Sequence, residues 1–369
     1  MQRLFTKFRQ SGFAAIVLVP LLAAGCGDSA GRDGIDVPVR TAPAVDRPGA
    51  GDSGTHSAGT PAEPLDIRTA LTPQQRGLYE LRKAGVRVEL NAQDLLEAVD
   101  FGETQVTDRL LKQLALFPSL KRILIFGGRA ASVTTAGVQH LAGLTNLEEL
   151  FLEDVPLSDA GMDPLSGLTE LRELSLEGTK ITDFGLLRLK ELPHLSSLWL
   201  DYTFVTDAGL KTLAEIPTLE MLGLRSTEVT DAGMAVIAGM QGLKVLVLNN
   251  TEVSDAGLAA IGRNRTLENL RLRNTRVTDD GLQHLSGLTE LKELRIAGTE
   301  VTDAGLKQLQ QFSGLKYVSV GGGGVTDAGL EHLAALPRLI SVHLENSQVT
   351  DEGLARFRKN YPNIEVDGR

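Results

Sequence analysis

Cysteine is almost absent from this chain, because Cys26 is the only one among 369 residues. A single thiol allows no intramolecular disulfide, and no zinc site with several cysteine ligands can be built from it. A cysteine-dependent ligase mechanism in the folded part of the chain is excluded for the same reason.

Aromatic residues and net positive charge are also scarce. Aromatics make up only 4% of the residues, whereas glycine alone occurs 39 times and leucine is abundant, a composition that suits a core of many similar small layers. The formal net charge is -10. An acidic surface repels phosphate backbones, so we expect no nucleic-acid partner.

The N-terminus has the pattern of a secretory signal. Basic residues in the first nine positions precede an apolar run at 13–24, which is too short for a permanent transmembrane helix of roughly 20 residues. The run leads through Ala-Ala-Gly into Cys26, and small residues before a lone cysteine resemble the lipobox of bacterial lipoproteins. The resemblance implies that 1–25 is a lipoprotein signal peptide and that Cys26 becomes acylated. An ordinary signal peptide with a chance cysteine is the alternative.

The segment 26–66 is predicted to be a disordered tether. It is rich in Gly, Ala, Asp, Pro and Ser and nearly free of large apolar residues, so it cannot bury enough surface to offset its ordering entropy. A random coil of this length has a typical reach of ~35 Å. Together with the lipid, the tether predicts a location in the cell envelope, anchored to a membrane and facing outside the cytoplasm.

The rest of the chain repeats with a period of 24 residues. The glycines in register are Gly137, Gly161, Gly185, Gly209, Gly233, Gly257, Gly281, Gly305, Gly329 and Gly353. Aspartates keep the same phase two residues earlier, from Asp159 to Asp351. Asp108 stands three residues out of step with this series, so we expect the extra residues, within 127–132, to form a loop.

One unit, 171–189, shows what each position does. Three leucines predict a short strand whose apolar side chains point inward. Thr179 then turns the chain, and its hydroxyl is expected to bond backbone groups inside the turn. Thr182 fits a helix N-cap, Asp183 suits the positive end of the helix dipole, and Gly185 lets the helix start pack tightly on its neighbour.

These units resemble the leucine-rich repeat, and the phrase Val-Thr-Asp-Ala-Gly-Leu at 205–210, 301–306 and 325–330 resembles bacterial repeat proteins of the planctomycete kind. The resemblance implies an α/β fold: a right-handed leucine-rich-repeat solenoid, or horseshoe, with a parallel sheet on the concave face and helices on the convex face.

Both ends of such a solenoid need caps. The N-terminal cap is predicted at 67–95 and the repeats with their C-terminal cap at 96–369. Thr72, Pro73 and Gln75 predict a helix with a capping box that runs to about Ala84 and stops at Gly85. A strand is expected near 86–90, the first repeat strand near 96–101, and the last near 364–366.

No pattern predicts catalysis, a metal or a cofactor. The catalytic Gly-x-Ser-x-Gly, phosphate-loop and His-Glu-x-x-His motifs are absent. His140, His284 and His332 share one helix position but lie six and two repeats apart, too far for one ion. Each aspartate of the repeat is expected to act alone, as a capping and dipole partner at its own helix start. We therefore expect a protein that is not an enzyme.

Two rows of strand residues should face outward from the concave surface. The first reads Leu124, Phe151, Ser175, Trp199, Gly223, Val247, Arg271, Arg295, Ser319 and His343. The second, two places on, reads Phe126, Glu153, Glu177, Asp201, Arg225, Asn249, Arg273 and Ala297. One end is aromatic and acidic, the middle is basic, and Trp, Tyr and Arg are frequent interface anchors. The candidate partner-binding residues are Phe151, Trp199, Tyr202, Arg225, Arg271, Arg273 and Arg295.

The function expected from these features is a non-enzymatic, lipid-anchored extracytoplasmic scaffold that binds a protein or peptide on its concave face. Two alternatives stay open. The chain could be a structural envelope protein without a specific ligand. It could also be a glycan-binding module that uses the aromatic and acidic end, namely Trp199, Tyr202, Glu153, Glu177 and Asp201.

Overall fold

The computed structural model describes residues 71–126, 130 and 132–368. The predicted signal peptide, the tether, Cys26 and the first residues of the predicted cap lie outside the described residues. Most of the predicted loop at 127–132 does so too.

Within the described residues, thirteen strands form one sheet whose spatial order follows the chain order. The strands are β1 Arg87–Leu90, β2 Leu96–Asp100, β3 Arg122–Ile125, β4 Glu149–Leu152, β5 Glu173–Ser175, β6 Ser197–Trp199, β7 Met221–Gly223, β8 Val245–Val247, β9 Asn269–Arg271, β10 Glu293–Arg295, β11 Tyr317–Gly321, β12 Ser341–Glu345 and β13 Glu365–Asp367. β1 pairs antiparallel with β2, and all later pairs are parallel.

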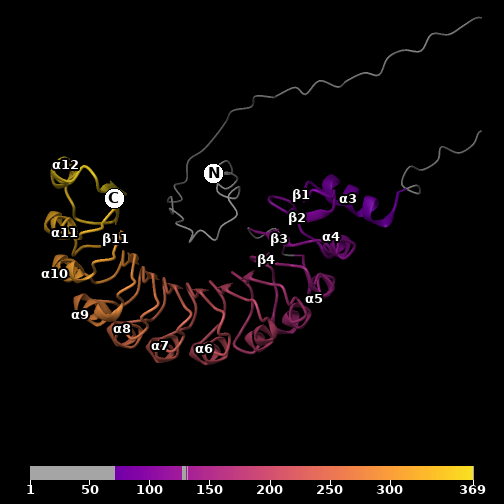
Figure 1. Cartoon of the computed structure of the whole chain (residues 1–369), viewed down its shortest axis with the longest axis horizontal. Helices are drawn as coiled ribbons and strands as arrows, with labels where there is room; N and C mark the ends of the chain where they lie inside the picture. Colours follow the sequence, from indigo (N-terminus) through magenta and orange to yellow (C-terminus); the bar gives the residue numbers. More distant parts are fainter. Residues whose placement is uncertain (1–70, 127–129, 131, 369) are drawn as a thin grey trace, which may run out of the picture. The chain divides into compact units, whose positions relative to one another are not determined.

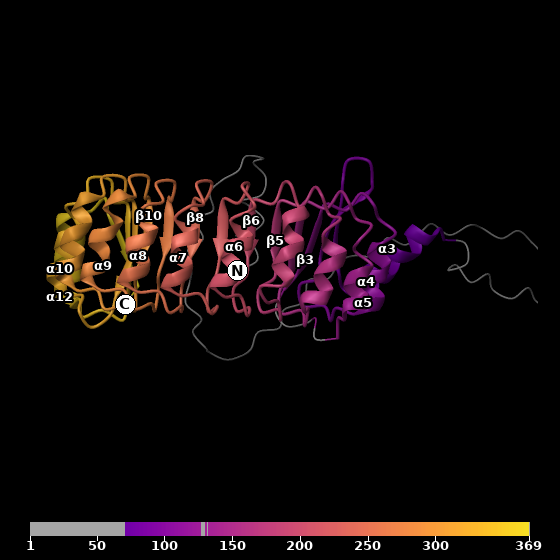
Figure 2. The same ribbon diagram turned by 90° about the horizontal axis from the view of Figure 1, so that it is seen from below.

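A short helix follows most strands. The α-helices are α3 Pro73–Lys83, α4 Asp108–Leu114, α5 Thr135–Gln139, α6 Asp207–Leu213, α7 Asp231–Ile237, α8 Asp255–Ile261, α9 Asp279–His284, α10 Asp303–Gln308, α11 Asp327–Leu333 and α12 Asp351–Asn360. The 3-10 helices are η1 Asp159–Leu165, η2 Gly185–Glu191, η3 Leu285–Gly287 and η4 Leu309–Gln311. In the repeats, strands line the inner side of an arc and helices its outer side (Figure 1), and the helices lie side by side (Figure 2). The strand-plus-helix prediction is thus confirmed.

The core is a stack of apolar layers between sheet and helices. In the unit that starts at Leu171, the strand leucines Leu174 and Leu176, the plug Ile181 and the helical Leu186 are all fully buried. Burying a leucine contributes about 1.5–3 kcal/mol. One short repeat cannot bury such a layer alone, so each repeat depends on its neighbours.

The turn after each strand is closed as expected from the threonine positions. The Thr179 hydroxyl donates to the Leu176 carbonyl at 2.6 Å. The same bond, at 2.6–2.7 Å, recurs at Thr203, Thr227, Thr251, Thr275 and Thr299.

The repeat aspartates do not act alone, which corrects the expectation from the sequence. Asp183 accepts two hydrogen bonds from the next repeat, from the Thr206 backbone N–H at 2.9 Å and from its hydroxyl at 2.7 Å. Thr206 in turn caps α6 by accepting the Ala208 N–H at 3.2 Å. Each carboxylate therefore fixes the helix cap of the repeat that follows it.

This contact recurs along the described repeats with N···O and O···O distances of 2.6–2.9 Å. The aspartates that make it are Asp108, Asp159, Asp183, Asp207, Asp231, Asp255, Asp279, Asp303 and Asp327. Thr135 occupies the aspartate position of its repeat, and the Ser158 side chain that follows it makes no cap bond.

The period-24 glycines leave room for these carboxylates. A Cβ added at Gly281 would lie 2.2 Å from Asp255 Oδ1, and one at Gly209 would lie 2.3 Å from Asp183 Oδ1. The expected tight packing of the helix start is confirmed, and its cause is the aspartate of the preceding repeat.

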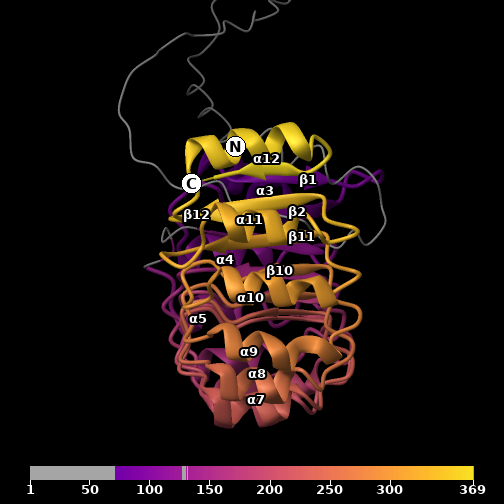
Figure 3. The same cartoon turned by 90° about the vertical axis from the view of Figure 1, so that its left-hand side faces the viewer.

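Both ends are closed by the predicted elements. Helix α3 begins with the capping box between Thr72 and Gln75 and ends before Gly85, which has φ +89°. Its buried Leu81 and the antiparallel strand β1 cover the first repeat. At the other end α12 lies next to α11 (Figure 3). Its Phe357 is fully buried, and β13 pairs with β12 as the last strand.

The contact between repeats can be tested with a double-mutant cycle. Gly281→Ala should lower the free energy of unfolding by about 1–3 kcal/mol, because the methyl meets the Asp255 carboxylate. Asp255→Ala should cost about 1–3 kcal/mol by removing two bonds to Thr278. The double variant should cost clearly less than the sum, because the obstructing carboxylate is gone.

Urea denaturation of the four proteins measures this coupling. Gly143→Ala is the control, since a Cβ there meets nothing within 4 Å. Strictly additive losses would contradict the proposed contact.

Candidate binding surface

The concave face carries three rows of strand side chains, one more than the sequence analysis used. The register confirms the first predicted row, from Leu124 on β3 to His343 on β12. The row that was missed lies two places earlier on each strand and includes Glu149, Glu173, Ser197, Asn269, Glu293 and Tyr317. The same alternation of inward and outward residues would have found it.

The aromatic end is built from neighbouring strands. The rings of Phe126 and Phe151 are 5.4 Å apart and inclined by 58°. The Trp199 ring lies over Gly223 of the next strand, where an added Cβ would stand 2.5 Å from the ring atom Cε3. Gly223 therefore lets the indole lie flat along the sheet.

The acidic side chains Glu153, Glu177 and Asp201 follow β4, β5 and β6 and are stacked one per repeat. Burial raises the pKa of Glu153 to about 7, with a further rise from the Glu177 charge, against a hydrogen bond from the Ser175 hydroxyl at 3.3 Å. Burial also raises the pKa of Asp201 to about 7, although its carboxylate accepts the Arg225 N–H at 2.9 Å. Burial raises the pKa of Glu177 as well, opposed by the Arg225 charge. Burial thus makes these three carboxyls easier to protonate than ordinary carboxyls.

Tyr202 occupies a turn position that is unfavourable for a bulky residue. Its φ is +57°, in the left-handed region. The same position holds Asp154, Gly178, Ser226, Asn250, Asn274 and Gly298 in other repeats. A large aromatic in this conformation is an outlier with a cost on the order of 1 kcal/mol. The residue is 44% exposed, and the centre of its ring lies 4.9 Å from the Arg225 guanidinium carbon Cζ.

The predicted basic centre is largely matched by acids that the sequence analysis overlooked. Arg271 and Arg295 both bind Glu293, with Nε–Oε1 distances of 3.2 Å and 2.5 Å, and the Glu293 side chain is 2% exposed. Arg273 pairs with Glu345, three strands further on. A residue between them, Ala297, is small and buried, which leaves space for this long contact.

Arg225 differs from these three arginines. Within the described residues its side chain has no ion pair, and its buried Nε atom lacks a hydrogen-bond partner. Its side chain contacts the Tyr202 ring. The structure thus brings Trp199, Tyr202 and Arg225 onto adjacent repeats, with Phe151 two strands before Trp199 and the paired arginines beyond Val247.

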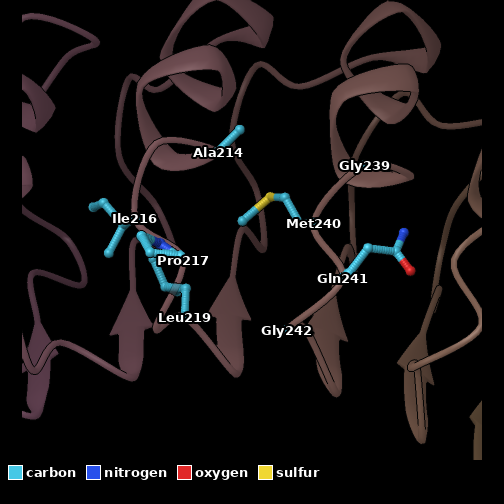
Figure 4. Close-up of a pocket in the computed structure, with 8 residues that line it drawn as sticks. All are labelled: Ala214, Ile216, Pro217, Leu219, Gly239, Met240, Gln241 and Gly242. Carbon is cyan, nitrogen blue, oxygen red and sulfur yellow. The ribbon is translucent and has the colours of Figure 1, made fainter.

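One hollow in the described part of the chain lies away from this face. It has a volume of about 290 Å³ and is lined by Ala214, Ile216, Pro217, Leu219, Gly239, Met240, Gln241 and Gly242, where the chain leaves α6 and α7 (Figure 4). None of the predicted binding residues lines it.

Two features are absent from the residues that the structure describes. No group of three His, Cys, Asp or Glu side chains there is arranged to hold a metal ion. No helix there is long and apolar enough to cross a membrane.

The raised acidic pKa values predict a stability change with pH. A carboxyl whose folded pKa is raised binds its proton more tightly in the folded state, so its contribution falls as pH rises between its unfolded and folded values. Between about pH 4 and pH 7, the ionisation of Asp201 should lower the free energy of unfolding by up to about 1.4 kcal/mol per pH unit.

Asp201→Asn keeps the oxygen that accepts the Arg225 N–H and removes the titration. Urea denaturation at several pH values should show a shallower loss of stability in this variant than in the wild type. The exposed Asp280→Asn should leave the slope unchanged. Equal slopes for Asp201→Asn and the wild type would contradict the burial effect.

Comparison with known proteins supports the repeat architecture. A family model described as Leucine Rich repeat matches residues 263–286. None of the curated proteins compared with the chain matches it.

Among solved structures, an internalin from Listeria monocytogenes is similar with a TM-score of 0.53 at 21% identity, over 74% of this chain and 86% of that one. An internalin C2 from the same organism has a TM-score of 0.44 at 26% identity, over 58% and 84% of the two chains. A leucine-rich-repeat protein from Leptospira interrogans has a TM-score of 0.41 at 17% identity, over 72% and 82%. The first likeness, the repeat match and the strand-and-helix stack agree: the described repeats form an α/β solenoid with the leucine-rich-repeat fold.

Proposed function

We propose that this protein is a non-enzymatic, lipid-anchored scaffold of the cell envelope that binds a protein or peptide on the concave face of its repeats. The proposal that it faces outside the cytoplasm rests on the signal-like N-terminus and the lipobox-like Cys26. The fold is consistent with a protein-binding role.

The observation that carries the binding proposal is Tyr202. The fold needs a small or polar residue in this turn, and neighbouring repeats supply one. A half-exposed tyrosine there costs stability and adds nothing to the core. Binding explains why such a residue stands beside the other aromatic and cationic groups of the face.

Trp199 and Arg225 complete the proposed anchor. The Trp199 ring lies along the sheet over Gly223 and offers a broad apolar contact. Arg225 has an unmet donor, Nε, and is held against the Tyr202 ring. Clustered Trp, Tyr and Arg side chains that lose water on binding contribute about 2 kcal/mol or more each at protein interfaces.

Phe151 and the paired arginines form the flanks of the proposed surface. Arg271, Arg273 and Arg295 each have an acidic partner, so their net charge is small. Each guanidinium still has N–H groups beyond those in its ion pair, and these can donate to a ligand. We propose that they determine specificity more than affinity.

Glycan binding is the second candidate. It is favoured by the Trp199 and Tyr202 rings beside Glu153 and Asp201, whose pKa values near 7 let each carboxyl donate as well as accept near neutral pH. The third reading, a structural envelope protein, requires no ligand.

Tyr202→Asn tests the binding proposal without threatening the fold, because asparagine suits the left-handed turn. The variant should be as stable as the wild type or up to about 1 kcal/mol more stable. Its affinity should fall about tenfold or more, as should that of Trp199→Ala.

The measurement is quantitative capture from the envelope fraction of the source organism, followed by interferometry on the captured partner. Asn250→Gly, in the same turn position two repeats on, is the matched control. Full binding by Tyr202→Asn and Trp199→Ala would remove the concave assignment. Hits on a glycan array would favour the glycan-binding candidate. If neither assay finds a ligand, the structural envelope protein is favoured.

The anchor is tested separately. Cys26→Ser should abolish incorporation of a labelled fatty acid and release the chain from the membrane fraction, because the thiol is the proposed acylation site. Radiolabelling and fractionation measure both effects. Membrane retention of the variant at the wild-type level would contradict lipidation.

A further inference from the structure

An exposed apolar patch lies outside the concave face, where two adjacent repeats meet. Phe184 is 77% exposed, Phe204 is 54% exposed and Leu187 is 48% exposed. Phe184 and Leu187 are three residues apart at the start of η2 and share one face. The three side chains depart from the repeat, so the patch is a local feature and not a property of every unit.

The neighbouring repeats show which residues are usual here. The position of Phe184 holds Ala160, Ala208, Ala232, Ala256, Ala304 and Ala328. The position of Phe204 lies on the loop that leads to each helix, and we call its occupants the edge row: Lys180, Phe204, Glu228, Glu252, Arg276 and Glu300. Among these six residues Phe204 is apolar and the other five are charged.

The edge row is regular and closely spaced. Lys180, Phe204 and Glu228 each donate a backbone N–H to the preceding repeat, at 2.7–3.0 Å. Parallel bridges join Thr182 to Phe204 and Thr206 to Glu228. Successive members come within ion-pair distance, as Glu252 and Arg276 do. Lys180 and Glu228 therefore flank Phe204 directly, one on each side.

These two flanking charges have no partner within the described residues. Both side chains are exposed, and neither forms an ion pair there, unlike Glu252 and Arg276. The sequence of the edge row around Phe204 is thus cation, aromatic, anion. Such a row is self-complementary, because its reverse places each charge opposite one of the other sign.

We propose that this patch is the contact surface for a second copy of the chain, in a two-fold dimer centred on Phe204. A two-fold contact brings every position opposite its mirror position on the other copy. With the axis at Phe204, the two phenylalanine rings meet, and Lys180 of each copy faces Glu228 of the other. The next pair outward is Pro156 with Glu252, which brings no like charges together.

The charge pattern selects a second copy over an unrelated partner. Lys180 needs an anion and Glu228 needs a cation, and a second copy supplies both. Each of these charges lies one repeat from Phe204, on opposite sides of it. Phe184 and Leu187, beside the row, add apolar surface to the same contact. Three apolar side chains and two ion pairs make a small contact, so we expect a weak dimer with a dissociation constant of about 1–100 µM.

Sedimentation velocity of the full-length chain tests the dimer. All proteins carry Cys26→Ser, so that no acyl chain contributes to association. The reference protein should show a monomer–dimer equilibrium. Phe204→Glu should be monomeric at every concentration, and its folding is not at risk because Glu228 and Glu252 occupy the same position in later repeats.

Charge reversal makes the test specific. Lys180→Glu places two glutamates opposite each other twice and should weaken the dimer about tenfold or more. Adding Glu228→Lys restores opposite charges and should return the dissociation constant to within about threefold of the reference. Glu300→Lys, in the same row four repeats from Phe204, should change nothing.

A monomeric reference protein throughout the concentration range would overturn the proposal. The proposal would also be overturned if the double variant did not recover the dissociation constant of the reference. Recovery is expected only when Lys180 of one copy faces Glu228 of the other. If Tyr202→Asn loses ligand capture but still dimerises, the result concerns the concave face alone. Failure of the ligand-binding proposal can therefore be told from failure of the dimer proposal.

Discussion

The solenoid depends on one contact, the aspartate carboxylate that reaches from each helix start to the threonine cap of the next repeat. It accepts both the backbone N–H and the hydroxyl of that threonine, so one charged group satisfies two donors at a helix N-terminus. The same threonine then accepts a helical N–H. A chain of hydrogen bonds thus links successive repeats on the side opposite the strands.

The glycine of the repeat follows from this contact. The carboxylate occupies the place where a Cβ would otherwise lie, and glycine is the residue that leaves it free. Aspartate, threonine and glycine therefore recur together because they form one joint between repeats. The apolar core fills the space between joints and sheet, and most of its leucines are fully buried.

Because the joints and the apolar core hold the repeats together, the outward-facing residues are free to vary. The clearest departures gather in the repeats around Trp199 and Phe204. Tyr202 takes a strained turn position, Gly223 makes way for an indole ring, and two phenylalanines replace alanine and a charged residue. On the concave face burial raises the pKa of the carboxyls at the acidic end, whereas the arginines of the basic centre pair with Glu293 and Glu345. Departures that cost stability are the natural places to look for function.

The period of 24 residues determined the strands, the helix starts and the first outward row without any coordinates, because these depend on neighbours in the chain. The capping box at Thr72 and the threonine bonds inside the turns were predictable for the same reason. Only the tertiary structure decided which repeat each aspartate serves, that β1 runs antiparallel, and that Arg271 and Arg295 share Glu293. The aspartate contacts and the Arg271–Glu293 pair join residues about one period apart, and Glu293 holds both arginines from a buried position. They depend on register and stacking, which a linear pattern does not specify.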